Sequence, residues 1–187
     1  MGNRPEEILK EVAEVGYKYI EAADYRDGKF YGMTPDEFKS TLEELDLVPL
    51  SAHMGTVTLE NTDQLITDVK AAGFKYFVIP VPPMGYFQYD RETRTPSMSD
   101  DLEGLTGILT TLGKKCKEAG LEMLYHNHNF EFEENKNGII PIEYFLEQKK
   151  QSGMVYYIVE QDQTFDGMKP LEAIRISHDG LKKFGFR

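Results

Sequence analysis

The chain has 187 residues, of which 40% are hydrophobic, 12% aromatic and 28% charged, which is the composition of a folded globular protein of about one domain. Its 32 acidic and 21 basic residues give a net charge of −11, which argues against nucleic acid as a partner because a duplex-binding surface must carry positive charge. The single cysteine, Cys116, excludes an internal disulfide. The sequence has no apolar run of ~20 residues and no hydrophobic core of a signal peptide, which predicts a cytoplasmic protein with no membrane partner.

One pattern recurs along the chain: a predicted helix ends at a glycine, and a short apolar run follows at once. Glycine is typical after a helix because the left-handed backbone there disfavours a side chain. In the second copy Asp46 takes the glycine position. The apolar runs are strand-length and rich in β-branched and aromatic residues. The predicted strands are residues 17–21, 47–52, 74–79, 121–126 and 154–160. Alternation of helix and strand predicts parallel βα units, with the helices outside one sheet, in an α/β fold over residues 1–187.

Start signals stand before the predicted helices. Thr34 precedes a proline, which places a capping hydroxyl directly before the first helical residue. Asn61 and the segment 99–103 are the predicted caps of the next two helices, and a final helix is expected over residues 168–183. The segments 25–33 and 82–98, which follow strand ends and are rich in polar residues, glycine and proline, are expected to be loops.

Reactive side chains gather at the exits of the predicted strands. Three of the four histidines, His53, His126 and His128, share the same phase of the repeat, and Glu131 and Glu160 also follow strands. Because the carboxyl ends of parallel strands meet at one edge, the sites of such folds are built there. The sequence therefore predicts that these five side chains surround one pocket.

Alternative interpretations remain for each of these residues. His126 and His128 alternate on a strand and point the same way, which suits a ligand site but also two structural imidazoles. A carboxylate at Glu160, directly after a buried strand, is costly unless it is paired or bound to a metal. His53 fits either role equally, and Glu21 fits a solvated loop or a helix cap as well as a site.

Two segments, Tyr125–Phe132 and Tyr157–Gln163, resemble strand-exit motifs of the xylose-isomerase-like TIM-barrel family, whose members are described as sugar phosphate isomerases/epimerases. Residues 16–21 and 50–53 are similar to the second and third strands of that family, and residues 170–183 to its last helix. The resemblance implies a (β/α)₈ barrel with a divalent metal at the strand ends. Oxygen and nitrogen ligands suit Mn, Mg, Zn or Co.

The resemblance also implies roles for individual residues. Glu131 and Glu160 match metal ligands and would serve as acid and base, whereas His53, His126 and His128 match substrate-binding positions. A small-molecule sugar or sugar derivative would lose and regain a proton next to its carbonyl through an enediolate. A lyase or hydratase acting on a keto-sugar would use the same parts.

The match to that family is incomplete. Five strands are legible where a barrel has eight. The first strand of the family and two later βα units, which carry its metal Asp and His, have no counterpart, and the apparent deletion falls near residues 148–149. We therefore expect a truncated barrel with low or absent isomerase activity and with open sheet edges through which the chain associates with itself. A non-catalytic member of the family is the alternative function.

Overall fold

The computed structural model describes residues 5–148 and 167–183, and its central feature is one parallel sheet. The sheet consists of β1 (Tyr19–Ala22), β4 (Val48–His53), β5 (Tyr76–Ile79) and β8 (Glu122–Tyr125), in that order. All three neighbouring pairs are parallel, and the strands lie in the sheet in the same order as along the chain. Four of the five predicted strands are thus confirmed, and the fifth, residues 154–160, lies outside the described residues.

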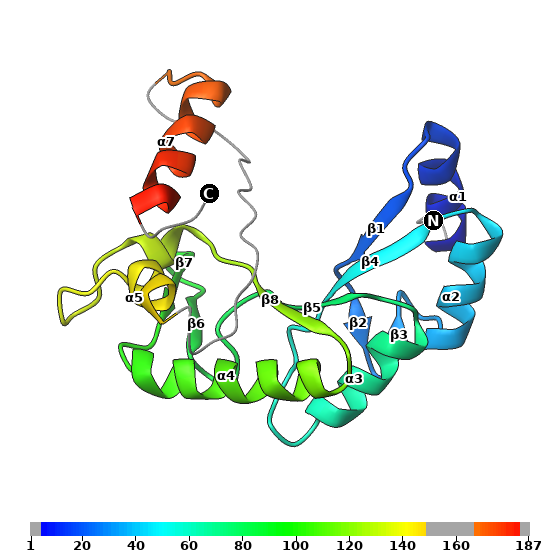
Figure 1. Cartoon of the computed structure of the whole chain (residues 1–187), viewed down its shortest axis with the longest axis horizontal. Coiled ribbons are helices and arrows are strands. Elements are labelled where there is room, and N and C mark those ends of the chain that lie inside the picture. The colour runs from blue at the N-terminus through cyan, green and yellow to red at the C-terminus, as the bar shows by residue number, and fades with distance from the viewer. Residues whose placement is uncertain (1–4, 149–166, 184–187) are drawn as a thin grey trace.

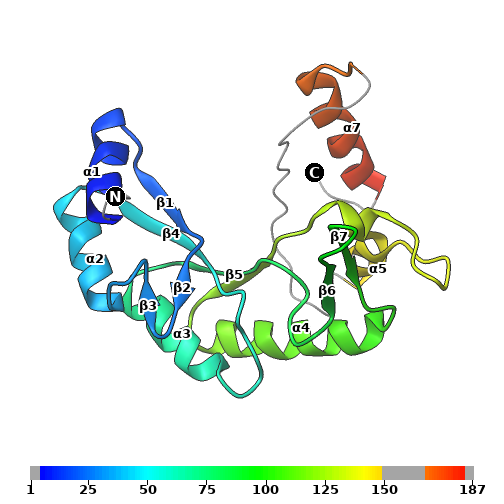
Figure 2. The same ribbon diagram turned by 180° about the vertical axis from the view of Figure 1, so that it is seen from behind.

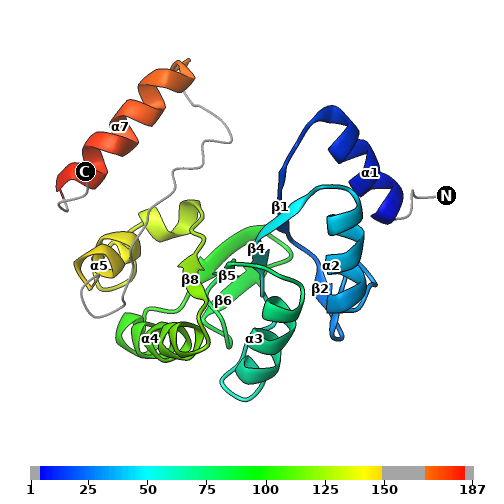
Figure 3. The ribbon, with the colours of Figure 1, turned by 45° about the vertical axis from the view of Figure 1, so that its right-hand side comes forward.

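Helices connect these strands and lie along the outer side of the sheet, so that sheet and helices form an open arc (Figure 1, Figure 3). The helices of the arc are α1 (Pro5–Val15), α2 (Pro35–Glu44), α3 (Thr62–Ala71), α4 (Leu102–Glu118) and α5 (Pro141–Glu147). The last described helix, α7 (Pro170–Lys183), stands apart from the sheet, as the view from behind also shows (Figure 2). This is the architecture of a (β/α) barrel that is incomplete over the part of the chain that is described.

The turns between helices and strands follow the sequence pattern. Gly73 and Gly120 have φ angles of 86° and 80°, and Asp46, in the copy without glycine, has a φ of 56°. At the start of α2, Thr34 Oγ1 accepts from the backbone N–H of Glu37 at 3.3 Å while the Glu37 carboxylate accepts from the backbone N–H of Thr34 at 2.8 Å. This reciprocal capping box confirms the predicted start of that helix.

The two other predicted caps differ in outcome. Asp101 caps α4, because its carboxylate accepts from the backbone N–H of Gly104 at 2.9 Å. Asn61 precedes α3, but its side chain makes no capping hydrogen bond there. Its side chain bonds to the preceding turn instead, where Oδ1 accepts from the backbone N–H of Thr58 at 2.7 Å and Nδ2 donates to the backbone carbonyl of Thr56 at 2.9 Å. The prediction of a side-chain cap at Asn61 is therefore wrong.

The two segments expected to be loops contain short antiparallel hairpins. These hairpins are β2 (Tyr25–Arg26) with β3 (Lys29–Phe30), and β6 (Phe87–Asp90) with β7 (Thr95–Met98). A turn of 3-10 helix, η1 (Asn129–Phe132), follows the exit of β8. Strands of two to four residues show too little alternation for a sequence pattern to reveal them.

The hydrophobic core lies between the sheet and the helices of the arc. Ala52, Phe77 and Ile79 contribute from the sheet, and Phe38 and Leu105 from α2 and α4, and all five are fully buried. Because successive residues of a strand face opposite sides, the neighbours of Ala52 face the concave side of the arc. One of those neighbours is His53.

Candidate functional site

Three histidines from the ends of two strands lie side by side. The rings of His53, at the end of β4, and His126, directly after β8, have centroids 5.3 Å apart. The rings of His126 and His128 are 4.8 Å apart and meet at 65°. The structure thus brings together His53, His126 and His128, hereafter the histidine row, across the carboxyl ends of the sheet.

Glu21 joins this group from the neighbouring strand. Its Oε1 lies 3.1 Å from Nε2 of His53, and its Oε2 accepts a hydrogen bond from the Ser51 hydroxyl. Glu21 pairs with Ser51 in the register of β1 and β4, which accounts for the contact. The sequence alone leaves the role of Glu21 open. The signal that could have assigned it to the site is its position at the end of a strand, which it shares with His53 in the repeat.

Glu131 is the most deeply placed of the predicted site residues, with 0% of its surface exposed. Its Oε1 accepts from the Tyr125 hydroxyl at 2.8 Å, and its Oε2 accepts from the backbone N–H of His128 at 2.7 Å. Burial raises the pKa of Glu131 above its ordinary value, and the two hydrogen bonds oppose that shift. The pKa of Tyr125 is also raised, first by burial and then by the charge of Glu131. The carboxylate thereby ties the η1 turn to the end of β8.

An aromatic stack supports the far end of the histidine row. The ring of His128 lies parallel to that of Phe130, with 5.5 Å between centroids and 8° between planes. Phe130 in turn contacts Phe87 of the β6–β7 hairpin at 5.6 Å. Stacking on Phe130 therefore orients the His128 ring, and the hydrogen bond from the backbone N–H of His128 to Glu131 holds the residue in place.

The described residues do not by themselves form a divalent-metal site. Over residues 5–148 and 167–183, no three side chains of His, Cys, Asp or Glu converge in an arrangement that could hold a metal ion. Both oxygens of Glu131 already accept hydrogen bonds from the protein. Glu160, the other predicted ligand, lies outside the described residues. Binding of a metal by this pair stays a prediction.

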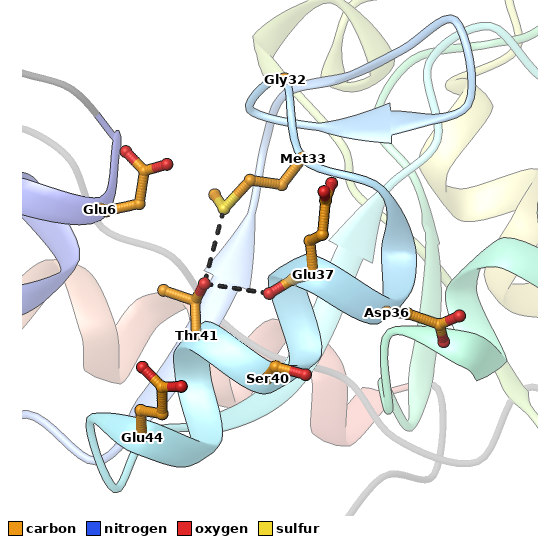
Figure 4. Close-up of a pocket in the computed structure, with 8 residues that line it drawn as sticks. All are labelled: Glu6, Gly32, Met33, Asp36, Glu37, Ser40, Thr41 and Glu44. Carbon is orange, nitrogen blue, oxygen red and sulfur yellow. Dashed lines mark hydrogen bonds between the residues drawn. The ribbon is translucent and has the colours of Figure 1, made fainter.

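A pocket of about 580 Å³ lies elsewhere, between α1 and α2 (Figure 4). It has an acidic lining, and Thr41 inside it donates to the backbone carbonyl of Glu37 at 2.9 Å. The lining residues are Glu6, Gly32, Met33, Asp36, Glu37, Ser40, Thr41 and Glu44. None of the predicted site residues belongs to this pocket.

Within the residues described, no helix is both long and apolar enough to cross a membrane. The fold and the placement of the histidine row are those of an α/β barrel protein of the TIM type, whose sites lie at the carboxyl ends of the strands.

No family model and no curated protein matches the sequence. Among solved structures, a sugar phosphate isomerase/epimerase from Parabacteroides distasonis ATCC 8503 is similar over 97% of this chain and 92% of that chain, with 19% identity and a TM-score of 0.55. An uncharacterized protein from the same organism is 15% identical with a TM-score of 0.51, and the match covers 91% of this chain and 63% of that one.

A third structure is a xylose isomerase-like TIM barrel protein from Mycobacterium smegmatis in complex with magnesium, with 15% identity and a TM-score of 0.46 over 67% of this chain and 47% of that one. The magnesium belongs to the description of that protein. At 19% identity, the likeness to the Parabacteroides isomerase/epimerase shows a shared fold. The resemblance found in the sequence is thus confirmed for the architecture.

Proposed function

We propose that this chain binds a sugar or sugar derivative at the histidine row and acts on it as an isomerase or epimerase, with the low turnover expected of a truncated barrel. The observation that supports this proposal is the convergence of His53, His126 and His128, with Glu21, on the edge where barrels of this type place their sites. A sugar presents a ring of hydroxyl groups, and imidazole nitrogens both donate and accept hydrogen bonds. Several adjacent imidazoles therefore suit such a ligand.

The reaction in this proposal is the transfer of a proton next to a carbonyl. A base removes the proton from the carbon beside the carbonyl, the electron pair moves toward oxygen to give an enediolate, and an acid returns a proton. Burial raises the pKa of Glu131, which is the direction that a general acid requires. Glu160 is its proposed counterpart as base. Since the described residues do not fit a metal, the divalent ion implied by the resemblance enters no step here.

The test is hydrogen exchange in deuterated water. The protein is incubated with D-fructose and with D-fructose 6-phosphate, and proton NMR follows loss of the signals from carbon-bound hydrogens next to the carbonyl. We expect exchange that falls at least tenfold in His126→Ala. His178→Ala is the matched control, because this fourth histidine lies on α7, apart from the sheet. Exchange equal to that of buffer alone, with and without manganese, would refute isomerase activity.

The second candidate is a non-catalytic sugar-binding protein. It is favoured by one observation: both oxygens of Glu131 are occupied in holding the η1 turn, so the residue serves the structure. The same NMR samples separate the candidates. Saturable binding of the sugar without any deuterium exchange would support the binding protein, whereas exchange would exclude it.

A further inference from the structure

We propose that Glu21 is a positioning residue that orients the His53 imidazole toward the bound sugar. This inference deepens the proposed function and rests on it for the identity of the ligand. One carboxylate joins two partners here: Oε1 lies 3.1 Å from Nε2 of His53, and Oε2 accepts from the Ser51 hydroxyl. All three residues belong to the paired strands β1 and β4.

The burial of His53 makes the Glu21 carboxylate important for the tautomer of its ring. Nε2 of His53 is buried and makes no well-aligned hydrogen bond within the described residues. A buried ring nitrogen requires a partner, and the Glu21 oxygen at 3.1 Å is an acceptor within hydrogen-bond distance. An ionised carboxylate can only accept, so it favours the tautomer of the neutral ring with its proton on Nε2.

The tautomer also determines how the other ring nitrogen can form hydrogen bonds. With the proton on Nε2, Nδ1 carries the lone pair and accepts a hydrogen bond from a sugar hydroxyl. Ser51 is 4% exposed and holds the second carboxylate oxygen, which limits rotation of Glu21. The side chain of His53 is 18% exposed and that of Glu21 is 52% exposed, so ligand can reach the pair.

The alternative roles for Glu21 do not fit the structure. The next helix, α2, begins at Pro35 and is capped by Thr34, so Glu21 caps no helix start there. Its two oxygens face Ser51 and His53, which distinguishes it from a carboxylate that only contacts solvent. The strand register, in which Glu21 stands opposite Ser51, produces this arrangement.

The first experiment reads the tautomer directly. Nitrogen-15 NMR of the imidazoles, with His53 assigned by its loss in His53→Ala, distinguishes a proton on Nε2 from one on Nδ1. We expect the Nε2–H form in the wild type and a mixture of both forms in Glu21→Ala. Asp24→Asn is the matched control, since it removes a carboxylate three residues further along that is paired with Arg26 at 3.5 Å. A His53 tautomer that is Nδ1–H in the wild type, or unchanged in Glu21→Ala, would overturn the proposal.

The second experiment measures affinity for D-fructose. Glu21→Ala and His53→Ala should each weaken binding about tenfold, and the double variant should be no weaker than His53→Ala, because Glu21 acts through that ring. Glu21→Gln, which keeps an acceptor oxygen, should recover most of the affinity and serves if Glu21→Ala does not fold. Additive losses would overturn the proposal. A wild type that binds no sugar would refute the proposed function, while the tautomer would still decide whether Glu21 positions His53.

Discussion

Replacement of Glu131 by alanine should destabilise the protein by about 2–4 kcal/mol. The side chain is completely buried, and the two hydrogen bonds that it accepts, from Tyr125 at 2.8 Å and from the His128 backbone at 2.7 Å, are lost together. Each donor left buried without a partner costs about 1–2 kcal/mol, and the sum gives the expected range. Glu131→Gln should cost less than about 1 kcal/mol, because its amide accepts from the His128 N–H and donates to the Tyr125 oxygen.

The same residue gives a defined pH dependence. Burial raises the pKa of Glu131 above its ordinary value of 4.5, so the folded protein holds this proton more tightly than the unfolded chain does. The contribution of the group to stability is therefore full below pH 4.5 and declines as the pH rises from there through the raised pKa. Glu131→Gln does not titrate and lacks this decline. Its stability relative to the wild type should thus increase as the pH rises through that window.

Urea unfolding followed by far-UV circular dichroism measures both effects, since the chain has no tryptophan for fluorescence. A chelator in every sample removes any contribution from bound metal, and urea midpoints are converted with the measured slopes. The reasoning fails if Glu131→Ala unfolds within 1 kcal/mol of the wild type, or if the glutamine variant is as unstable as the alanine variant. A relative stability of Glu131→Gln that falls with rising pH would contradict the assigned direction of the pKa.

Three further predictions concern helix packing, the thiol and association. Gly104→Ala should destabilise, because its Cβ would overlap a carboxylate oxygen of the Asp101 cap. Gly107→Ala on the same helix has nothing within 4 Å and should stabilise by about 0.5–1 kcal/mol in urea unfolding, so equal effects of the two variants would refute this. Burial raises the pKa of the Cys116 thiol to about 12, so Ellman's reagent at pH 8 should label it in urea alone, and rapid native labelling would contradict this. Tyr19 is 64% exposed on β1, which ends the described sheet, so sizing chromatography should show self-association that Tyr19→Lys weakens; a monomeric wild type would disprove it.

The backbone architecture could be predicted because local signals and the fold agree. Glycines with positive φ end the helices, and apolar runs follow them. The sequence was therefore sufficient to predict the four strands and their parallel arrangement. The hairpins β2–β3 and β6–β7 could not be predicted in this way. Their strands have two to four residues, and their pairing depends on loop geometry that no periodic pattern records.

The site was predictable only in part, for a physical reason. A common phase in the repeat placed His53, His126 and His128 at one edge, and the ring distances of 5.3 Å and 4.8 Å confirm that they meet. The partners of the carboxylates depend on rotamers and register, which the sequence does not display. The hydrogen bonds that Glu131 accepts from Tyr125, and Glu21 from Ser51 on the neighbouring strand, could therefore not be predicted.

The two ends of the histidine row are held in different ways, and this difference decides where function can be tested. At the β8 end, Glu131 is fully buried and Phe130 stacks on His128, so a change there alters the folding of the η1 turn together with the site. At the β1 end, Glu21 is half exposed and contacts His53 from the rim of the sheet. A half-exposed carboxylate contributes less to folding than a fully buried one, because water solvates part of it in the folded state. Variants of Glu21 should therefore report on the site while leaving the fold intact, whereas a loss of activity in Glu131 variants becomes informative only once their stability has been measured.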